Sequence, residues 1–211
     1  MKRLLLLLLF PSLCQAGEFK KVRDAEWEFS GLMGPADAAR YKELFLEEKG
    51  RFKVTVDSEG GYLSAGADMA FVTYLMHERV DLVAKECYSA AAMWVSADPG
   101  HAFYDDKSLI AWHLAWMSYG GIPVEQSVGD TSRLAMMVWE SMRLTLPKDK
   151  ADTVFNSMCH ARDKYGINGF VVFQKNKPRR VGLWKPDGWE WEDGSASVLP
   201  TRLDPFYIRP H

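Results

Sequence analysis

Residues 54–61 read VTVDSEGG, a short apolar–polar alternation that runs into a pair of glycines. Alternation predicts a β-strand over 52–56, and the helical spacing of 64–79 predicts that a helix follows a tight turn at 57–61. Paired glycines at a strand end leave backbone N–H groups free of side-chain obstruction. Such groups, close to a helix start, suit a developing oxyanion, although a plain strand-to-helix turn uses the same glycines.

The rest of the chain alternates between strand-like and helix-like segments. The expected strands cover 27–34, 80–84 and 109–116, and the expected helices cover 35–48, 90–95, 130–144 and 152–164. Residues 170–173 and 181–184 are expected to pair as a late hairpin, after a polar lead-in at 17–25 and before an irregular end beyond 186. This order predicts an α/β fold, with parallel strands covered by helices on both faces.

The first sixteen residues have the order of a secretory leader. Lys2 and Arg3 precede a short leucine run, Pro11 interrupts it, and Ala16 supplies a small residue at the expected cleavage point. The run is too short to span a bilayer, which takes about 20 apolar residues. A lipid-anchored reading at Cys14 is the alternative. The sequence thus predicts export to the periplasm or beyond, with a mature chain starting near residue 17.

Charge and cysteine content restrict the possible partners. After loss of Lys2 and Arg3 the chain carries 24 basic and 28 acidic side chains, a formal charge of −4, with no basic patch suited to nucleic acid or anionic membranes. Cys87 and Cys159 either pair or stay free thiols, and no spaced Cys/His set predicts a metal site. No cofactor is expected.

A serine stands between a strand and a helix of small residues at 88–93, YSAAAM. Ser89 is therefore expected at the positive end of that helix and at the carboxyl edge of the sheet, where α/β folds place ligands. A serine in this position can also act as an ordinary helix N-cap without any chemistry. The position makes Ser89 a candidate nucleophile.

A histidine lies within the apolar stretch 108–116, SLIAWHLAW. His113 needs a partner or a cavity in such surroundings, and imidazole is the usual base that activates a serine hydroxyl near neutral pH. A hydrogen-bonded core histidine is the alternative. His113 is the candidate base.

The three stretches occur in an order that resembles the Clp-type serine proteases of the Clp/crotonase superfamily. The family's Ser-Pro-Gly-Gly turn reads Ser58-Glu59-Gly60-Gly61 here, its nucleophile heads a small-residue helix as Ser89 does, and its histidine falls at His113. Residues 164–167, KYGI, resemble the Glu-Tyr-Gly-Leu near the family's domain end. The likeness covers about 28–170, and Glu59 and the tryptophans beside His113 depart from the family pattern.

The resemblance implies a fold, a mechanism and a domain plan. It implies stacked ββα units over 17–170, which follow the signal peptide predicted at 1–16 and precede a Trp-rich extension at 171–211, with a short β or irregular tail, that has no counterpart in the family. It also implies a catalytic triad of Ser89, His113 and an acid, with Asp152 preferred over Asp163. Gly60, Gly61 and Ala90 would form the oxyanion hole.

The expected function is an exported serine peptidase that acts on polypeptides and forms homo-oligomers, as the resemblance implies. Two alternatives use the same scaffold: an esterase or thioesterase with the same oxyanion hole, and a non-catalytic oligomeric binding protein.

Overall fold

The computed structural model describes residues 17–97, 102–119, 122–123, 128–174, 180–185 and 188–191. The strands are β1 (Glu18–Arg23), β2 (Glu26–Met33), β3 (Phe52–Gly61), β4 (Val80–Tyr88), β5 (Ala102–Trp112), β6 (Ser118–Tyr119), β7 (Ile122–Pro123), β8 (Gly169–Phe173), β9 (Arg180–Lys185) and β10 (Gly188–Trp191). The α-helices are α1 (Pro35–Glu47), α2 (Leu63–Leu75), α3 (Ala90–Ser96), α4 (Val128–Thr145) and α5 (Lys148–Tyr165), and short 3-10 turns η1 (His77–Arg79) and η2 (Gly166–Asn168) precede β4 and β8.

One sheet organises the described chain, with strand order β1-β2-β3-β4-β5-β8-β9-β10. Strands β2 to β5 are parallel to one another, whereas β1 is antiparallel to β2 and the successive pairs from β5 through β8 and β9 to β10 are antiparallel. Helices α1, α2 and α3 connect the successive parallel strands. The predicted α/β class and the predicted late hairpin are therefore confirmed.

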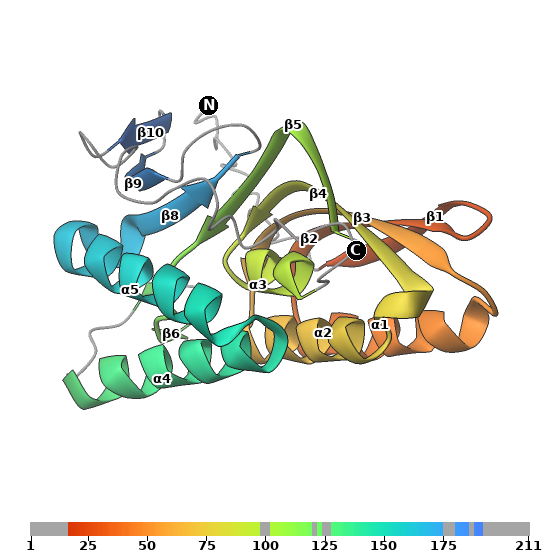
Figure 1. Ribbon diagram of the computed structural model, residues 1–211, viewed down its shortest axis with the longest axis horizontal. Helices are drawn as coiled ribbons and strands as arrows, with labels where there is room; N and C mark the ends of the chain where they lie inside the picture. The colour runs from red at the N-terminus through yellow and green to blue at the C-terminus, as the bar shows by residue number, and fades with distance from the viewer. Residues whose placement is uncertain are drawn as a thin grey trace, which may run out of the picture.

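All five α-helices lie on the same side of the sheet (Figure 1). The strand order explains this arrangement for α1, α2 and α3, because right-handed crossovers between parallel strands that always step in the same direction return these helices to the same face. The expectation of helices on both faces was wrong. The sequence already carried the signal, since strands buried on both faces are continuously apolar and β3 alternates buried Val54 and Val56 with half-buried Thr55 and exposed Asp57.

The core between sheet and helices contains a cluster of aromatic rings from β1, β2, α1 and α3. Trp94 is fully buried at its centre, with its ring centroid 5.5 Å from that of Phe29 and 4.9 Å from that of Tyr41. The buried Thr73 hydroxyl lies 2.8 Å from the Tyr41 hydroxyl and accepts a 3.0 Å hydrogen bond from the Trp94 indole N–H. This packing fixes α3, which begins directly after Ser89.

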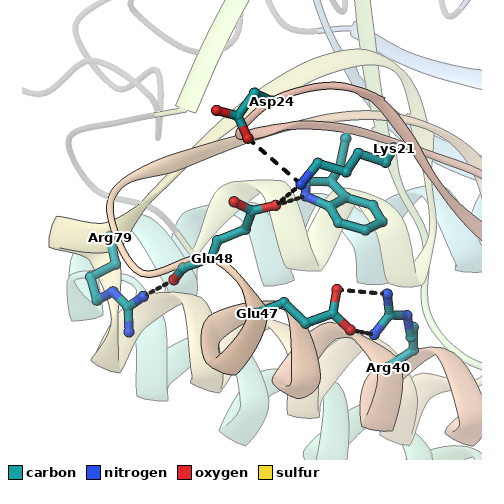
Figure 2. Close-up of polar contacts among 7 residues, drawn as sticks. Lys21, Asp24, Arg40, Glu47, Glu48 and Arg79 are labelled. Atoms are coloured by element: carbon teal, nitrogen blue, oxygen red, sulfur yellow. Dashed lines mark hydrogen bonds and ion pairs between the residues drawn. The ribbon is translucent and has the colours of Figure 1, made fainter.

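A charged cluster joins the end of α1 to the first hairpin and to η1 (Figure 2). The Glu48 carboxylate accepts hydrogen bonds from Lys21 Nζ at 2.7 Å and from the Trp27 indole N–H at 3.0 Å. The Glu48 carbonyl accepts from the Arg79 guanidinium. The Lys21 hydrogen bond lowers the pKa of Glu48, against the effect of burial. These four residues, called the Glu48 cluster below, satisfy one another.

Two local predictions were wrong at the N-terminal half. Residues 18–23 form β1 instead of a loose lead-in, because Phe19 packs with its ring centroid 4.7 Å from that of Phe29. Residues 57–61 continue β3 instead of forming a tight turn, with an irregular register between Val56 and Ser58 in the pairing with β4. The glycines there end a strand.

Further boundaries also shifted. Strand β5 begins at Ala102 and ends at Trp112, so His113 follows the strand instead of lying inside it. Part of the extension expected to be irregular pairs as β10 with β9. The signal peptide predicted at 1–16 and the chain end at 192–211 lie outside the described residues.

Candidate functional site

Ser89 occupies a sharp turn between β4 and α3, at the N-cap of the helix. Its φ of 55° and ψ of −119° lie in a region that favours glycine, and Ala25 is the only other non-glycine residue of the described chain with positive φ. The Ser89 N–H donates to the Ala111 carbonyl at 2.8 Å, and its own carbonyl accepts from the Met93 N–H at 3.1 Å. The backbone on both sides therefore holds the turn.

The Ser89 side chain is not used as a helix cap. It makes no capping hydrogen bond, although a capping serine normally accepts from the second or third N–H of its helix. Ser89 instead lines a cavity that His113 also lines. A strained backbone that presents an uncommitted hydroxyl at a strand-to-helix turn is the geometry of a nucleophile elbow.

Gly60 packs directly against this turn. Its φ is +90°, and a Cβ placed there would lie 2.5 Å from the Tyr88 carbonyl oxygen and 2.7 Å from the Ser89 Cβ. Gly61 has a φ of +148°, and a Cβ on it would meet the Met33 carbonyl oxygen at 2.2 Å. Only glycine therefore fits either position without a rearrangement.

The predicted oxyanion hole divides into two kinds of residue. The Gly60 N–H already donates to the Ser58 hydroxyl at 3.1 Å, and that hydroxyl donates to the Gly31 carbonyl at 2.6 Å. Ala90 is the first residue of α3, so its N–H has no carbonyl partner one turn earlier in the helix. This arrangement gives Gly60 a shaping role. The assignment of Gly61 and Ala90 as oxyanion donors stays a prediction.

His113 is buried, with 9% of its surface exposed, immediately beyond the end of β5. Its ring stacks on Trp116 at a centroid distance of 4.3 Å and meets Phe170 edge-on at 4.6 Å. Nδ1 lies 2.8 Å from the Leu114 carbonyl oxygen. A carbonyl can only accept, so Nδ1 carries the proton and Nε2 is left as the acceptor of a neutral imidazole.

Burial controls the charge of this histidine. Loss of solvation lowers the pKa of His113 to about 4, the Leu114 hydrogen bond opposes that effect, and the positive charge of Arg162 adds to it. The imidazole is therefore neutral at physiological pH, which is the state that a general base requires.

Ser89 and His113 line the same cavity. The other lining residues are apolar and come from α3, β5, α4 and α5: Met93, Trp112, Val138, Met142 and Met158. The volume is about 20 Å³, which holds about one water molecule and no acyl group. Among the described residues no hydrogen bond joins the Ser89 hydroxyl to His113, although both residues line this cavity.

The acid candidates do not contact the imidazole through a hydrogen bond. The Asp152 carboxylate accepts from the Trp139 indole N–H at 2.8 Å, which ties α5 to α4. Asp163 is exposed, and its charge raises the pKa of Cys159 together with the larger effect of burial. In this structure the Leu114 carbonyl occupies Nδ1. The identity of a third catalytic member stays a prediction.

Arg162 is a group that the sequence reasoning missed. Its Nη1 atom is buried and has no hydrogen-bond partner, and its charge acts on His113. Arg162 follows Met158 by four residues on α5, which places both on one face of the helix. No local pattern in the sequence indicates that one guanidinium nitrogen of an arginine near the end of a helix is shielded from solvent.

Cys87 and Cys159 are free thiols, and the buried Cys87 thiol contacts the Val56 carbonyl at 3.3 Å. Within the described residues no three His, Cys, Asp or Glu side chains gather as a metal would require. None of the helices in that part of the chain is long and apolar enough to cross a bilayer.

Comparison with known proteins gives structural likeness only. No protein-family model matches the chain, and no curated protein matches it. The structure is similar to ClpP1 from Listeria monocytogenes, with a TM-score of 0.49, 12% identity, and coverage of 69% of this chain and 89% of that chain. It is also similar to a point mutant of ClpP1 from the same organism, with a TM-score of 0.45, 11% identity, and coverage of 69% of this chain and 80% of that chain. These likenesses assign no residue a role.

Proposed function

We propose that this chain is an exported serine hydrolase that cleaves polypeptides through an acyl-enzyme on Ser89. One observation carries the proposal: a serine held on a glycine-favouring turn, with no capping bond, lines one small cavity together with a neutral histidine. An ordinary N-cap serine would have used its hydroxyl on the helix, and an ordinary core histidine would not share a cavity with it.

The chemistry proceeds from these groups. The Ser89 oxygen attacks the carbonyl carbon while its proton passes to Nε2 of His113. The N–H groups of Gly61 and Ala90 hold the oxyanion of the tetrahedral intermediate, which collapses as His113 gives the proton to the leaving amine. Water, deprotonated in turn by His113, then releases the acyl group. Each oxyanion donor contributes about 100- to 1000-fold in rate.

The cavity must widen before this reaction begins. Its roof consists of Val138 and Met142 from α4 and Met158 from α5. Methionine side chains are unbranched and repack readily, so they can give way to a substrate with little cost. The hydrolase therefore rests in a closed state, and substrate binding opens it.

Labelling with a small fluorophosphonate tests the proposal directly. The wild-type chain is expected to bind one probe per molecule, and Ser89→Ala is expected to bind none while it unfolds at the same temperature or higher. Ser64→Ala is the matched control, because Ser64 is an exposed serine at the start of α2. Labelling that persists in Ser89→Ala would contradict the proposal. Absence of labelling in the wild type, even under mild heating to widen the cavity, would contradict it as well.

Peptide and ester cleavage are separated by their substrates. An unstructured protein and a set of short-chain esters are incubated with the wild type and with Ser89→Ala. Ser89-dependent fragments of the protein support a peptidase, and ester turnover without such fragments moves the assignment to an esterase.

Export and assembly belong to the same proposal. The order of residues 1–16 supports removal of a leader and release from the cytosol. Mass analysis of the expressed full chain should give a mature protein that starts at Gly17, found outside the cytosolic fraction. Light scattering of that protein is expected to give a multiple of the monomer mass.

A further inference from the structure

Arg162 carries a positive charge that nothing in its surroundings neutralises. Its guanidinium makes no ion pair among the described residues, and the Nη1 atom is shielded from solvent without a hydrogen-bond partner. Arg162 as a whole is half-buried, but a donor atom that is shielded from solvent without a partner is costly, and native structures keep few of them. The missing partner must be an acceptor, and an anionic acceptor offsets the cost best.

The nearby acids are already committed elsewhere. The Asp152 carboxylate accepts a hydrogen bond from Trp139, and Asp163 is exposed and forms no ion pair with Arg162 among the described residues. The partner of Arg162 is therefore a group that the described chain does not supply.

The position of Arg162 indicates which portion of a substrate it would contact. Met158, one helical turn earlier on the same face of α5, lines the cavity that holds Ser89 and His113. The Arg162 charge also acts on His113 itself. In the proposed mechanism His113 delivers a proton to the leaving amine, so groups beside His113 lie along the leaving portion of the substrate.

We propose that Arg162 binds the free C-terminal carboxylate of the peptide, so that Ser89 cleaves the bond preceding a C-terminal residue. This inference rests on the proposed hydrolase function and narrows its substrate class to peptides with a free carboxyl end. In the leaving amino acid, only Cα separates the carboxylate from the nitrogen that receives the proton from His113. A cation beside His113 is therefore well placed to bind that carboxylate. The planar guanidinium accepts a carboxylate through paired N–H donors.

A carboxylate at this site would also assist the base. Its negative charge offsets the effect by which Arg162 lowers the pKa of His113. The imidazole, which is neutral at physiological pH in either case, then becomes a stronger base when the correct substrate is bound.

Matched peptides test the inference without any variant. One peptide carries a free C-terminus, and its twin carries a C-terminal amide. We expect kcat/KM to be about 10- to 100-fold higher for the free acid, the range for hydrogen bonds to a charged group, with release of the last residue. Equal rates for the two peptides would overturn the assignment.

Substitution of the arginine localises the effect. In Arg162→Gln the ratio of kcat/KM for the free acid to kcat/KM for the amide is expected to fall to about 1, chiefly through the KM of the free acid. Arg162→Lys keeps the charge and should retain part of the preference, which covers the case in which the glutamine variant folds poorly. Arg133→Gln, an exposed arginine on α4, is the control and should keep the full preference.

A binding measurement separates this inference from the hydrolase proposal. N-acetylglycine is titrated into Ser89→Ala while the ring signals of His113 are followed by NMR. A saturable shift that is lost in Ser89→Ala/Arg162→Gln supports the carboxylate site even if the wild type does not hydrolyse peptides. Fluorophosphonate labelling of Ser89 with no shift on titration would retain the hydrolase and reject the carboxylate site.

Discussion

The Glu48 cluster and the Ser89 cavity both place polar groups against the same core. The polar groups of the cluster have hydrogen-bond partners, whereas two polar groups near the cavity have none within the described chain. In the Glu48 cluster every charge meets a partner: the carboxylate meets Lys21 and Trp27, and the carbonyl meets Arg79 (Figure 2). Around the cavity, the Ser89 hydroxyl caps nothing and the Arg162 Nη1 bonds to nothing.

This difference distinguishes a structural polar group from a functional one. A satisfied cluster gains stability from its hydrogen bonds and has no capacity left for a ligand. An unsatisfied group costs stability in the resting protein and regains it when a ligand arrives, so its placement is explained by binding. Substitutions in the two regions should accordingly separate stability from activity.

The largest expected effect belongs to His113. Replacement by glutamine in His113→Gln should lower the rate of Ser89-dependent hydrolysis by about 10⁴-fold, since a triad without its base keeps little of its activity. In the wild type the neutral imidazole persists until the pH falls toward about 4, so kcat/KM should be flat above about 5 and lost as the pH falls through about 4. A pH–rate profile measures both. A midpoint at the ordinary histidine value would show that the base lies outside this buried site.

Glu48→Gln is expected to act on stability alone. Loss of the charge weakens the hydrogen bonds from Lys21 and Trp27, and the free energy of unfolding should fall by about 1–2 kcal/mol at neutral pH. The folded protein holds the pKa of Glu48 below its usual value of 4.5, so the unfolded state takes up the proton first as the pH drops. The stability gained from Glu48 is therefore present above about 4.5 and lost in more acidic solution.

Urea titrations of wild type and Glu48→Gln at neutral and acidic pH provide the measurement. The difference in the free energy of unfolding between wild type and Glu48→Gln should decrease as the pH falls below about 4.5. Labelling of Ser89 per folded molecule should be the same in both proteins, and a loss of labelling would erase the distinction between the two regions.

The smallest expected effect on chemistry comes from the roof of the cavity. Met142→Val shortens a buried side chain above Ser89 and should raise the rate of fluorophosphonate labelling by about 10-fold, which corresponds to about 1.4 kcal/mol in the barrier to opening. Met137→Val is the control, because Met137 lies on the same helix and is 46% exposed. Equal rates in the two variants would mean that the roof does not limit access to the serine.

The sequence predicted the order of elements well because each parallel strand and its helix form a local unit. The alternation in β3 and the small residues of α3 identified these elements directly. Strand β1 escaped prediction because EFKKVR carries only one strongly apolar side chain facing inward, and Phe19 gains its place only from Phe29 and Tyr41, which lie far along the chain.

The candidate site was predictable in part for the same reason. Ser89 stands in a short local pattern and could be singled out, and His113 was conspicuous in an apolar stretch. The surroundings of Asp152 and Arg162 depend on the rotation of α5 about its own axis relative to α4 and β8. Residue spacing within α5 does not predict that rotation. The acid for His113 was therefore left open, and the arginine was not noticed.

The backbone conformation at Ser89 makes serine less favourable than glycine for the stability of the fold. A glycine at position 89 would adopt the same φ and ψ without penalty, whereas serine there costs of order 1–3 kcal/mol. Selection for stability alone would thus favour glycine over serine at position 89, with loss of the hydroxyl. A chain that still has its hydroxyl at this point has kept a side chain that folding alone would discard.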